Sequence, residues 1–406
     1  MKTCWLVGSF SLFVSSALAG PLKITTERIE SDCAFAVLDF EILGAPEDRT
    51  VSLKSSPGGE AVPCQIVWRK ASGVKIAWLA KSLKKDDELA WEVDFIPADT
   101  KVAAKVEVKA SGEDFEVLFG GSLFTRLVHD PAQRKPYLFP LMGPSGKMIT
   151  RQFPMKAKVE GEDQDHPHHR SLWFTHGAVG GVDFWAEGEK TGSIQKTKVE
   201  AAESGPVYGR ITTLNEWVTP EKKKLLDDRR VLTFYPLERG QSFVDVSVTL
   251  TAAGDDVIFG DTKEGSFGIR LAESMKESRG GVVVTSRGVK GTKDAWGKPA
   301  EWIDYVGKVE GDTVGVAILD HPTSFRHPTH WHVRDYGLFA ANPFGYHDFY
   351  KNEPGKDGAH KLKKGESMNF KYRVYLHHGS VDDAKVAEVY SGFANPPKLK
   401  AKAEKG

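Results

Sequence analysis

The chain has few cysteines, no net charge and a single long apolar run, and each of these features excludes a class of protein. Three cysteines occur among 406 residues, and none belongs to a CxxC pair, which argues against zinc-ribbon and thioredoxin-type sites. Lysine plus arginine and aspartate plus glutamate both total 55, so charge does not favour nucleic acid or an acidic membrane as partner. HExxH zinc motifs and GxSxG nucleophile elbows are also absent. A neutral small molecule fits this composition best.

The apolar run lies at the N-terminus and predicts an export signal. Lys2 precedes an apolar stretch over residues 5–14, and Ala17-Leu18-Ala19 then supplies a small-x-small cleavage pattern. We predict a signal peptide over residues 1–19. An uncleaved membrane anchor is the alternative, but the run is short for a spanning helix. We therefore expect an exported protein, periplasmic or extracellular, with no membrane span in the mature chain.

The composition and the hydrophobic pattern predict a mainly β protein. The 40 glycines, 21 prolines and 10 tryptophans are typical of many short strands joined by turns. Short apolar or alternating runs predict a small β-sandwich-like module over residues 20–117, in which we recognise no chemistry. Residues 118–395 are also mainly β, and the alternation over residues 243–250 predicts a half-buried antiparallel strand. One helix is expected after Ser380. The Lys- and Ala-rich residues 396–406 predict a disordered tail.

Two cysteines, Cys33 and Cys64, remain once the predicted signal is removed. In an oxidising compartment they could form a disulfide that closes a loop of about thirty residues, worth ~3 kcal/mol by the loop-entropy estimate. Two separate buried thiols are the alternative, and the sequence does not choose between them.

Histidines are concentrated in two short runs. Imidazole is the usual proton carrier at neutral pH and the commonest metal ligand, so we expect the two runs to meet at one site. The flanking prolines indicate that some of these histidines have structural roles in loops. The first run holds His166, His168, His169 and His176, and the second holds His321, His327, His330 and His332.

The spacing within each run predicts which imidazoles share a face. The proline after His166 favours an extended backbone, so His166 and His168 should point to one side and His169 to the other. His330 and His332 are also two residues apart and should project together from a strand. These two pairs could surround a divalent metal. They could equally bind a polar ligand through hydrogen bonds, because no motif specifies the metal.

Aromatic and charged residues near the runs suggest a ligand class. Aromatic faces beside mixed polar groups, as at Trp173 and Trp331, suit a sugar, although burial in a sandwich core is the alternative. Within residues 260–270, Glu264 could act as general base and Lys263 as electrostatic stabiliser, or both could lie on a surface hairpin. Directly after the second run, an arginine could hold the substrate beside an orienting aspartate, or the two could form a structural ion pair.

The chain resembles the bacterial PmoA-like proteins, a family of unknown function named after a methane oxygenase. Membrane monooxygenase subunits need several spanning helices, which this chain lacks after its predicted signal, so the family name is misleading here. The matching stretches cover roughly residues 118 to 378 and are Pro136-Tyr137-Leu138-Phe139-Pro140, Asp165 to Arg170 (DHPHHR), Gly181 to Trp185 (GVDFW), Gly260 to Arg270, and His327 to Gly345 (HPTHWHVRDYGLFAANPFG).

The resemblance implies an antiparallel β-supersandwich like that of galactose mutarotase, preceded by the small N-terminal module, and it implies work on carbohydrates. We therefore expect an exported enzyme that uses acid–base chemistry on a saccharide or oxidised sugar, as a lyase, hydrolase or epimerase. A non-catalytic glycan-binding protein and a metal-dependent oxygenase are the alternatives. The expected catalytic residues are His168, His332 and Glu264; the expected substrate-binding residues are His169, Arg170, Trp173, Lys263, Trp331, Arg334, Asp335 and Asn342; and the expected ligands of a divalent metal are His166, His168, His330 and His332.

Overall fold

The structure of the chain is a computed structural model that describes residues 12–13, 22–100, 102–351 and 353–402. The chain divides into two compact units, which we describe separately. Most of the predicted signal peptide, including its cleavage site, lies outside the described residues. The first unit comprises Met1–Ala104, Gly205–Val207 and Ala387–Gly406, and the second comprises Lys105–Ser204 and Tyr208–Val386.

The first unit is a small sandwich of two β-sheets. Alternate residues of β3 (Cys33–Leu43) are buried from Ala36 to Ile42, as the two-residue period of a strand requires. Trp78 and Trp91, one from each sheet, meet edge to face in the core with ring centroids 5.2 Å apart. In spatial order, one sheet contains β27 (Leu399–Lys402), β2 (Leu22–Thr26), β8 (Ala90–Pro97), β4 (Arg49–Ser56) and β5 (Ala61–Val62), and the other contains β1 (Leu12–Phe13), β3, β7 (Gly73–Leu83) and β6 (Cys64–Lys70).

Two predicted boundaries differ from the structure. The N-terminal segment of the first unit ends at Ala104 rather than at residue 117, because β9 (Val106–Ser111) and β10 (Asp114–Phe119) pair within a sheet of the second unit. The predicted disordered tail over residues 396–406 contains β27, which pairs with β2 from Lys23↔Lys402 to Thr26↔Leu399. Backbone pairing along a strand explains why a Lys- and Ala-rich segment is ordered there.

Cys33 and Cys64 are free thiols in the structure, so the alternative of two separate cysteines holds. The Cys33 thiol donates to the carbonyl oxygen of Ser31, and the Cys64 thiol donates to that of Val51. Burial raises the pKa of the Cys64 thiol to about 11, so this group stays protonated at neutral pH.

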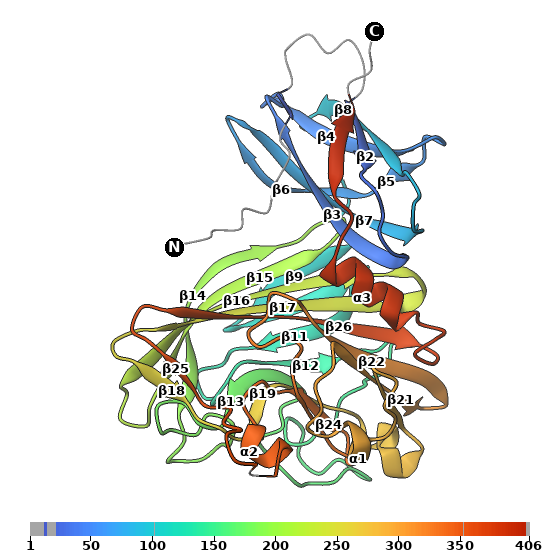
Figure 1. Cartoon of the computed structure of the whole chain (residues 1–406). Coiled ribbons are helices and arrows are strands. Elements are labelled where there is room, and N and C mark those ends of the chain that lie inside the picture. Colours follow the sequence, from blue (N-terminus) through green and yellow to red (C-terminus); the bar gives the residue numbers. More distant parts are fainter. Residues whose placement is uncertain (1–11, 14–21, 101, 352, 403–406) are drawn as a thin grey trace. The chain divides into compact units, whose positions relative to one another are not determined.

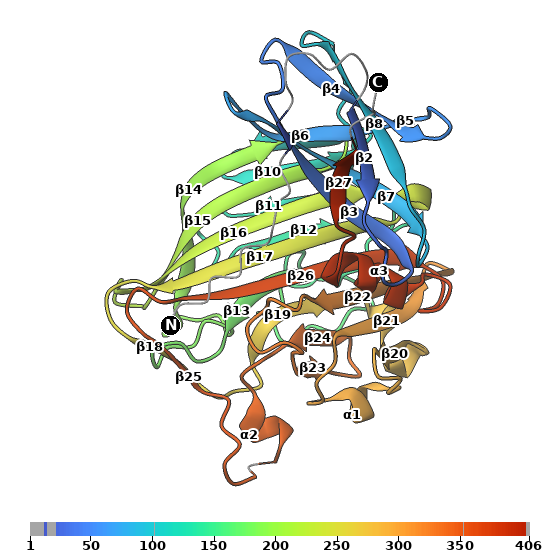
Figure 2. The same ribbon diagram turned by 45° about the horizontal axis from the view of Figure 1, so that its top comes forward.

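The second unit is a sandwich of two eight-stranded antiparallel sheets (Figure 1). Figure 2 shows the long strands of the second sheet side by side. The prediction of a mainly β fold, with a large antiparallel sandwich after a small β module, is confirmed. In spatial order, the first sheet contains β23 (Trp331–Val333), β24 (Leu338–Ala341), β19 (Gly265–Arg270), β13 (Leu172–His176), β12 (Tyr137–Leu141), β11 (Ser122–Val128), β10 and β9, and the second contains β14 (Ser193–Glu203), β15 (Gly209–Val218), β16 (Lys224–Pro236), β17 (Ser242–Ala252), β26 (Ser367–His378), β22 (Asp312–Asp320), β21 (Trp302–Val309) and β20 (Val282–Thr285).

The apolar core of the second unit lies between these two sheets. Phe267 of the first sheet and Tyr372 of the second stack with ring centroids 4.9 Å apart. Strand β17 buries the alternate residues from Val244 to Leu250 in this core, as the alternation predicted. The outer face of the first sheet carries a separate cluster that includes Trp173, Trp185 and Ala340. Strand alternation therefore divides the first sheet into a core face and an outer face, and the candidate site lies on the outer face.

Helices are short and few in the described part of the chain. The helix expected after Ser380 begins only at Val386, because Asp383 N–H donates to Ser380 Oγ (3.2 Å) and closes a turn first. None of these helices has the length and the apolar character needed to span a membrane. The helices are α1 (Thr292–Ala295), α2 (Tyr346–Phe349) and α3 (Val386–Ala394), with 3₁₀ turns at Glu238–Gly240, Glu273–Met275 and Glu277–Arg279, and β18 (Val257–Phe259) and β25 (His360–Leu362) form a separate strand pair.

Candidate functional site

The first histidine run forms a tight turn, and the prediction of an extended backbone is wrong. His166 has a φ of 43°, and His169 N–H donates to the carbonyl oxygen of His166 at 3.0 Å. The turn therefore gathers all three imidazoles instead of separating them by face. The ring of His166 stacks on that of His169 (centroids 4.7 Å apart), and the ring of His168 meets His169 edge to face at 4.6 Å.

Two buried arginines hold this turn through the carboxylate of Asp165. Arg270 Nη2 donates to Asp165 Oδ1 at 2.7 Å, and Arg151 Nη1 donates to the same oxygen. Both guanidinium groups are fully buried, whereas the Asp165 side chain is 35% exposed. Burial works against ionisation of Asp165, but Arg270, a hydrogen bond from His166 and Arg151 outweigh it, so the pKa of this carboxyl is lowered. A buried charge needs such a partner, which makes Asp165 central to the local structure.

Asp165 also orients the imidazole of His166. The distance from His166 Nδ1 to Asp165 Oδ2 is 2.8 Å, so Nδ1–H donates to the carboxylate, and Nε2 is the nitrogen that remains to act as acceptor. The His166 ring is exposed, unlike the ring of His169. A solvent-facing imidazole oriented by a carboxylate is the usual arrangement of a general base. The sequence predicts His166 only as a metal ligand, although the preceding aspartate could have indicated this pair.

Tyr336 is a central residue that the sequence analysis missed as a site residue. Its ring stacks on His166 with centroids 5.2 Å apart. The guanidinium carbon of Arg270 lies 4.6 Å from the Tyr336 ring centroid and that of Arg334 lies 5.7 Å from it, both within cation–π range. Tyr336 therefore joins the first histidine run to the segment that follows the second.

Charges from three segments act on Tyr336. Burial is the main cause of its raised pKa, and the two arginines oppose the rise. The nearby carboxylates of Glu264 and Asp165 add to it. The phenol therefore stays protonated at neutral pH and can donate a hydrogen bond.

His332 brings the second histidine run to the same face of the first sheet. It lies on β23 opposite Ala340, which belongs to the outer-face cluster. Its Nδ1–H donates to the carbonyl oxygen of Lys263 at 2.7 Å, which leaves the lone pair on Nε2. Burial is the main cause that lowers the pKa of His332 to about 3, and the charge of Arg334 contributes to the shift. His332 is therefore a neutral hydrogen-bonding group at physiological pH rather than a proton carrier.

Glu264, Lys263 and Arg334 supply the half-buried charges of the site. Lys263 Nζ lies 3.3 Å from Glu264 Oε1 and 3.9 Å from Asp348 Oδ1. Arg334 has no carboxylate partner among the described residues, so the alternative of an ion pair with Asp335 is not realised there. The Asp335 side chain is exposed. Arg334 thus presents an uncompensated guanidinium beside Tyr336.

His168 and Arg170 face a second buried charge group. Arg170 Nε lies 3.1 Å from both carboxylate oxygens of Glu187, and Lys135 Nζ lies 3.2 Å from Glu187 Oε1. Burial is the main cause that lowers the pKa of Lys135 to about 8. Burial, aided by the charge of Lys135, lowers the pKa of His168 to about 4. Lys135 and Glu187 are further residues that the sequence analysis missed.

Three of the predicted substrate-binding side chains are buried in structural contacts. Trp331 lies in the sandwich core, where its Nε1–H donates to the carbonyl oxygen of Ala300 at 2.9 Å. Trp173 is 2% exposed and stacks on His169. Asn342 is fully buried and donates to the carbonyl oxygen of Thr262. Strand alternation points Trp331 into the core, whereas Trp173 lies on the outer face beneath His169 and Asn342 follows the end of β24. Substrate binding by these three side chains stays a prediction, and their burial argues against it.

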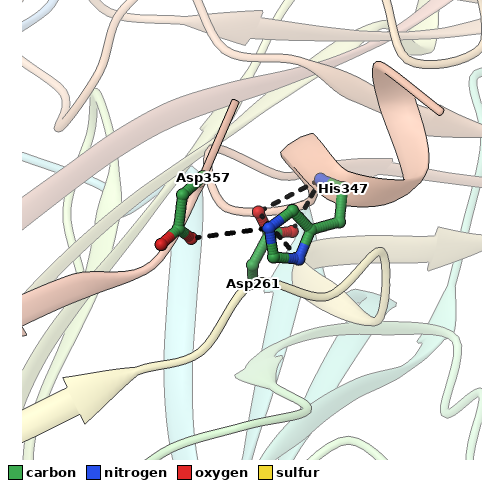
Figure 3. Close-up of side chains that lie close together, drawn as sticks. All are labelled: Asp261, His347 and Asp357. Atoms are coloured by element: carbon green, nitrogen blue, oxygen red, sulfur yellow. Dashed lines mark hydrogen bonds and ion pairs between the residues drawn. The ribbon is translucent and has the colours of Figure 1, made fainter. Parts of the chain in front are cut away.

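The predicted metal ligands are not gathered as a set. His330 Nε2 pairs with the Tyr350 hydroxyl at 2.9 Å, and its ring packs on Tyr346 and Phe349, away from His166. Among the described residues, one other group of three side chains could bind a metal ion, because its histidine nitrogen and carboxylate oxygens all lie within 4.8 Å of one another (Figure 3). That group is Asp261, His347 and Asp357.

The buried carboxylate in this group already has structural partners. Asp261 accepts hydrogen bonds from the backbone N–H of His347 at 3.0 Å and from that of Gly358. These bonds join the start of α2 to the loop that follows it. They account for the burial of Asp261 without a cation.

The comparisons with known proteins show a family. One family model, described as a family of unknown function (DUF6807), matches residues 114–391. No curated protein matches the sequence.

Two solved structures resemble the fold weakly. An alpha-mannosidase from Enterococcus faecalis V583 is 10% identical and aligns with 96% of this chain and 47% of its own, with a TM-score of 0.39. A galactose mutarotase related enzyme from Lactobacillus acidophilus is 10% identical and aligns with 72% of this chain and 99% of its own, with a TM-score of 0.30. The chain spans about half of the length of the mannosidase, and at these TM-scores neither likeness bears on the site. Because the family model covers more than half of the sequence, the chain belongs to the family of unknown function DUF6807.

Proposed function

We propose that the chain is a carbohydrate-active enzyme that moves a proton on a saccharide or oxidised sugar at the site around His166. The observation that carries the proposal is the pair of His166 and Asp165, held by two fully buried arginines and stacked against Tyr336. Burying two guanidinium groups beside a carboxylate costs free energy, so this arrangement is unusual around a surface histidine that has no function.

The geometry favours particular roles for three residues. His166 Nε2 is the proton acceptor, because its Nδ1–H is committed to Asp165. The protonated phenol of Tyr336 is the hydrogen-bond donor or acid beside it. Arg334 carries an uncompensated positive charge at the same place, which suits the carboxylate of an oxidised sugar. His332 and Glu264 complete the polar wall.

This arrangement favours a lyase or an epimerase over a hydrolase. Glycoside hydrolases commonly use two carboxyl groups, one on each side of the bond that is broken. Asp165 is engaged by Arg151, Arg270 and His166, so it is not available as the second carboxyl group beside Glu264. A single base that abstracts a proton next to a carbonyl or carboxylate, with an acid beside it, matches the groups present.

The proposals of a saccharide substrate and of export depend on the sequence. The neutral overall charge and the resemblance to PmoA-like proteins support a sugar, and the predicted signal peptide supports export to the periplasm or extracellular space. The burial of Trp173 and Trp331 weakens the alternative of an aromatic glycan-binding shelf. The separation of His330 from His166 weakens the alternative of a histidine-bound oxygenase metal.

The test is turnover of a panel of sugars, uronates and keto-sugars by wild type and His166→Ala. We expect turnover to fall at least about a hundredfold, the usual range for loss of a positioned base. His378→Ala is the matched control, since His378 lies at the end of β26 on the other sheet and contacts the backbone of Arg239. Unchanged turnover in His166→Ala contradicts the proposal, as does saturable sugar binding without any product.

A further inference from the structure

His168 lies in the candidate site with both of its ring nitrogens open. The residue is half-buried, and neither nitrogen has a hydrogen-bond partner among the described residues. The indole nitrogen of Trp185, whose ring His168 contacts, is also unpaired but is sealed from solvent, whereas the nitrogens of His168 are not. A ligand can therefore reach His168 and supply the hydrogen bond that the protein does not.

The imidazole of His168 is held in place by other rings. It meets the ring of His169 edge to face with centroids 4.6 Å apart and an angle of 82° between the planes. The ring of His166 lies 5.7 Å away at 76°, and that of Trp185 lies 6.5 Å away at 61°. Packing thus fixes the orientation of the ring without using its nitrogens. A group that is ordered before the ligand arrives loses less conformational entropy on binding.

The charge state of His168 favours a hydroxyl group as its partner. Burial, aided by the charge of Lys135, lowers its pKa to about 4, so the ring is neutral at neutral pH and offers one N–H donor and one lone pair. Lys135 itself is already paired with Glu187, at 3.2 Å. A carboxylate could bond only to the N–H and an ammonium group only to the lone pair, whereas a hydroxyl group can bond to either nitrogen.

A metal ion is a less suitable partner for this imidazole. His166 and His168 could supply two ligands. Within the part of the chain that the structure describes, however, no further histidine, cysteine or carboxylate joins them in a group of three with ligand atoms within 4.8 Å of one another. Zinc sites in proteins usually have at least three protein ligands.

We propose that His168 recognises a hydroxyl group of the saccharide and so restricts the site to sugars that carry both a carboxylate and hydroxyl groups, the uronates. The inference rests on the proposed function at His166, from which the saccharide and its carboxylate are taken. The ring of His166 contacts that of His168 and stacks on that of Tyr336, which lies beside Arg334. A uronate over His166 places its carboxylate at Arg334 and a hydroxyl group at His168. Neutral sugars lack the first contact, and simple carboxylic acids lack the second.

Nuclear magnetic resonance of the full chain, labelled with ¹⁵N in its histidines, tests the hydroxyl contact without requiring turnover. D-glucuronate, D-galacturonate, D-mannuronate and acetate are titrated separately, and the His168 ring signals are identified by their loss in His168→Phe. We expect at least one uronate to shift these signals in a saturable manner and acetate to leave them unchanged. Signals that respond to none of the three uronates, or that respond equally to acetate, overturn the proposal.

A matched pair of variants separates recognition from packing. His168→Phe keeps an aromatic ring against His169 but removes both nitrogens, so it should weaken uronate binding about tenfold in calorimetry, equivalent to ~1.4 kcal/mol. His360→Phe is the control, because His360 is also half-buried and packs on an aromatic ring, that of Phe325, but lies on β25 outside the candidate site. Equal binding by the two variants overturns recognition by His168.

The same measurements keep this proposal separate from the proposed function. His166→Ala should lower turnover and leave the His168 signals responsive to the uronate. Turnover that survives in His166→Ala, together with responsive His168 signals, contradicts only the role of His166. Unresponsive His168 signals, together with turnover that depends on His166, contradict only the role of His168.

Discussion

His332 Nδ1 lies 2.7 Å from the carbonyl oxygen of Lys263, a residue 69 positions earlier in the chain. This hydrogen bond fixes the orientation of the imidazole and brings the second histidine run to the segment that carries Glu264. On the same face, the ring of Tyr336 stacks on the ring of His166. Residues from three distant segments therefore share one place on the outer face of the first sheet.

Asp165→Ala should destabilise the protein because it leaves two buried guanidinium groups without a carboxylate. We expect a loss of ~2–3 kcal/mol in the free energy of unfolding, below the usual cost of breaking a fully buried pair because Asp165 is 35% exposed. Urea denaturation measures the loss. Asp163→Ala is the control, since Asp163 pairs with Lys276 at a more exposed position. Equal losses in the two variants would contradict the role of Asp165.

The same carboxylate should make stability depend on acidity. The pKa of Asp165 is lowered in the folded protein, so its stabilisation is present above its unfolded pKa of about 3.9 and is lost as pH falls through the lower folded value. Unfolding free energies measured between neutral pH and the acid limit should therefore fall less steeply in Asp165→Asn than in wild type. Parallel pH profiles would rule this contribution out.

His377 and Asp304 form a fully buried pair on the second sheet, and this pair should respond to pH in the opposite direction. His377 Nε2 lies 2.9 Å from Asp304 Oδ1. Burial disfavours the charged imidazole, but the charge and hydrogen bond of Asp304 outweigh it, so the pKa of His377 is raised. Stabilisation is then complete below the unfolded pKa of about 6.5 and is lost as pH rises through the folded value.

His377→Gln tests that pair. Breaking a buried ion pair costs ~3–5 kcal/mol, so we expect a loss of this order in the unfolding free energy near pH 6. The difference between wild type and variant should shrink as pH rises toward 9. A constant difference across this range would show that the pair is not ionised in the folded protein.

Variants of Arg334 and Trp331 distinguish a residue that binds substrate from a residue that packs in the core. Trp331→Ala should cost ~3–5 kcal/mol of stability, since it empties a core position. Arg334→Gln should change stability by less than about 0.5 kcal/mol, because the group is half-buried and has no carboxylate partner among the described residues. With an acidic sugar as substrate, Arg334→Gln should raise KM and change kcat little, because Arg334 binds the carboxylate equally in the ground state and in the transition state. Chemical denaturation and steady-state kinetics together measure these effects, and an unchanged KM would remove Arg334 from the substrate site.

The fold class could be predicted from the sequence because strand periodicity is local. Alternation over residues 243–250 correctly marks β17. The domain boundaries and the order of the C-terminal segment were harder to predict from the sequence. The strands β9 and β10 form a local hairpin, but its place in the second unit and the pairing of β27 with β2 depend on partners elsewhere in the chain, which residue patterns alone do not reveal.

The site was only partly predictable for the same reason. The sequence by itself marked the two histidine runs, Glu264 and Arg334 as candidates, since residue type and spacing are visible in it. Only the tertiary structure decided that His166 rather than His168 is the exposed imidazole paired with a carboxylate, and that Tyr336 stacks against it. A turn sets the direction of each side chain, and burial sets its charge state. Both depend on neighbours such as Arg151 and Arg270 that folding brings together from distant positions.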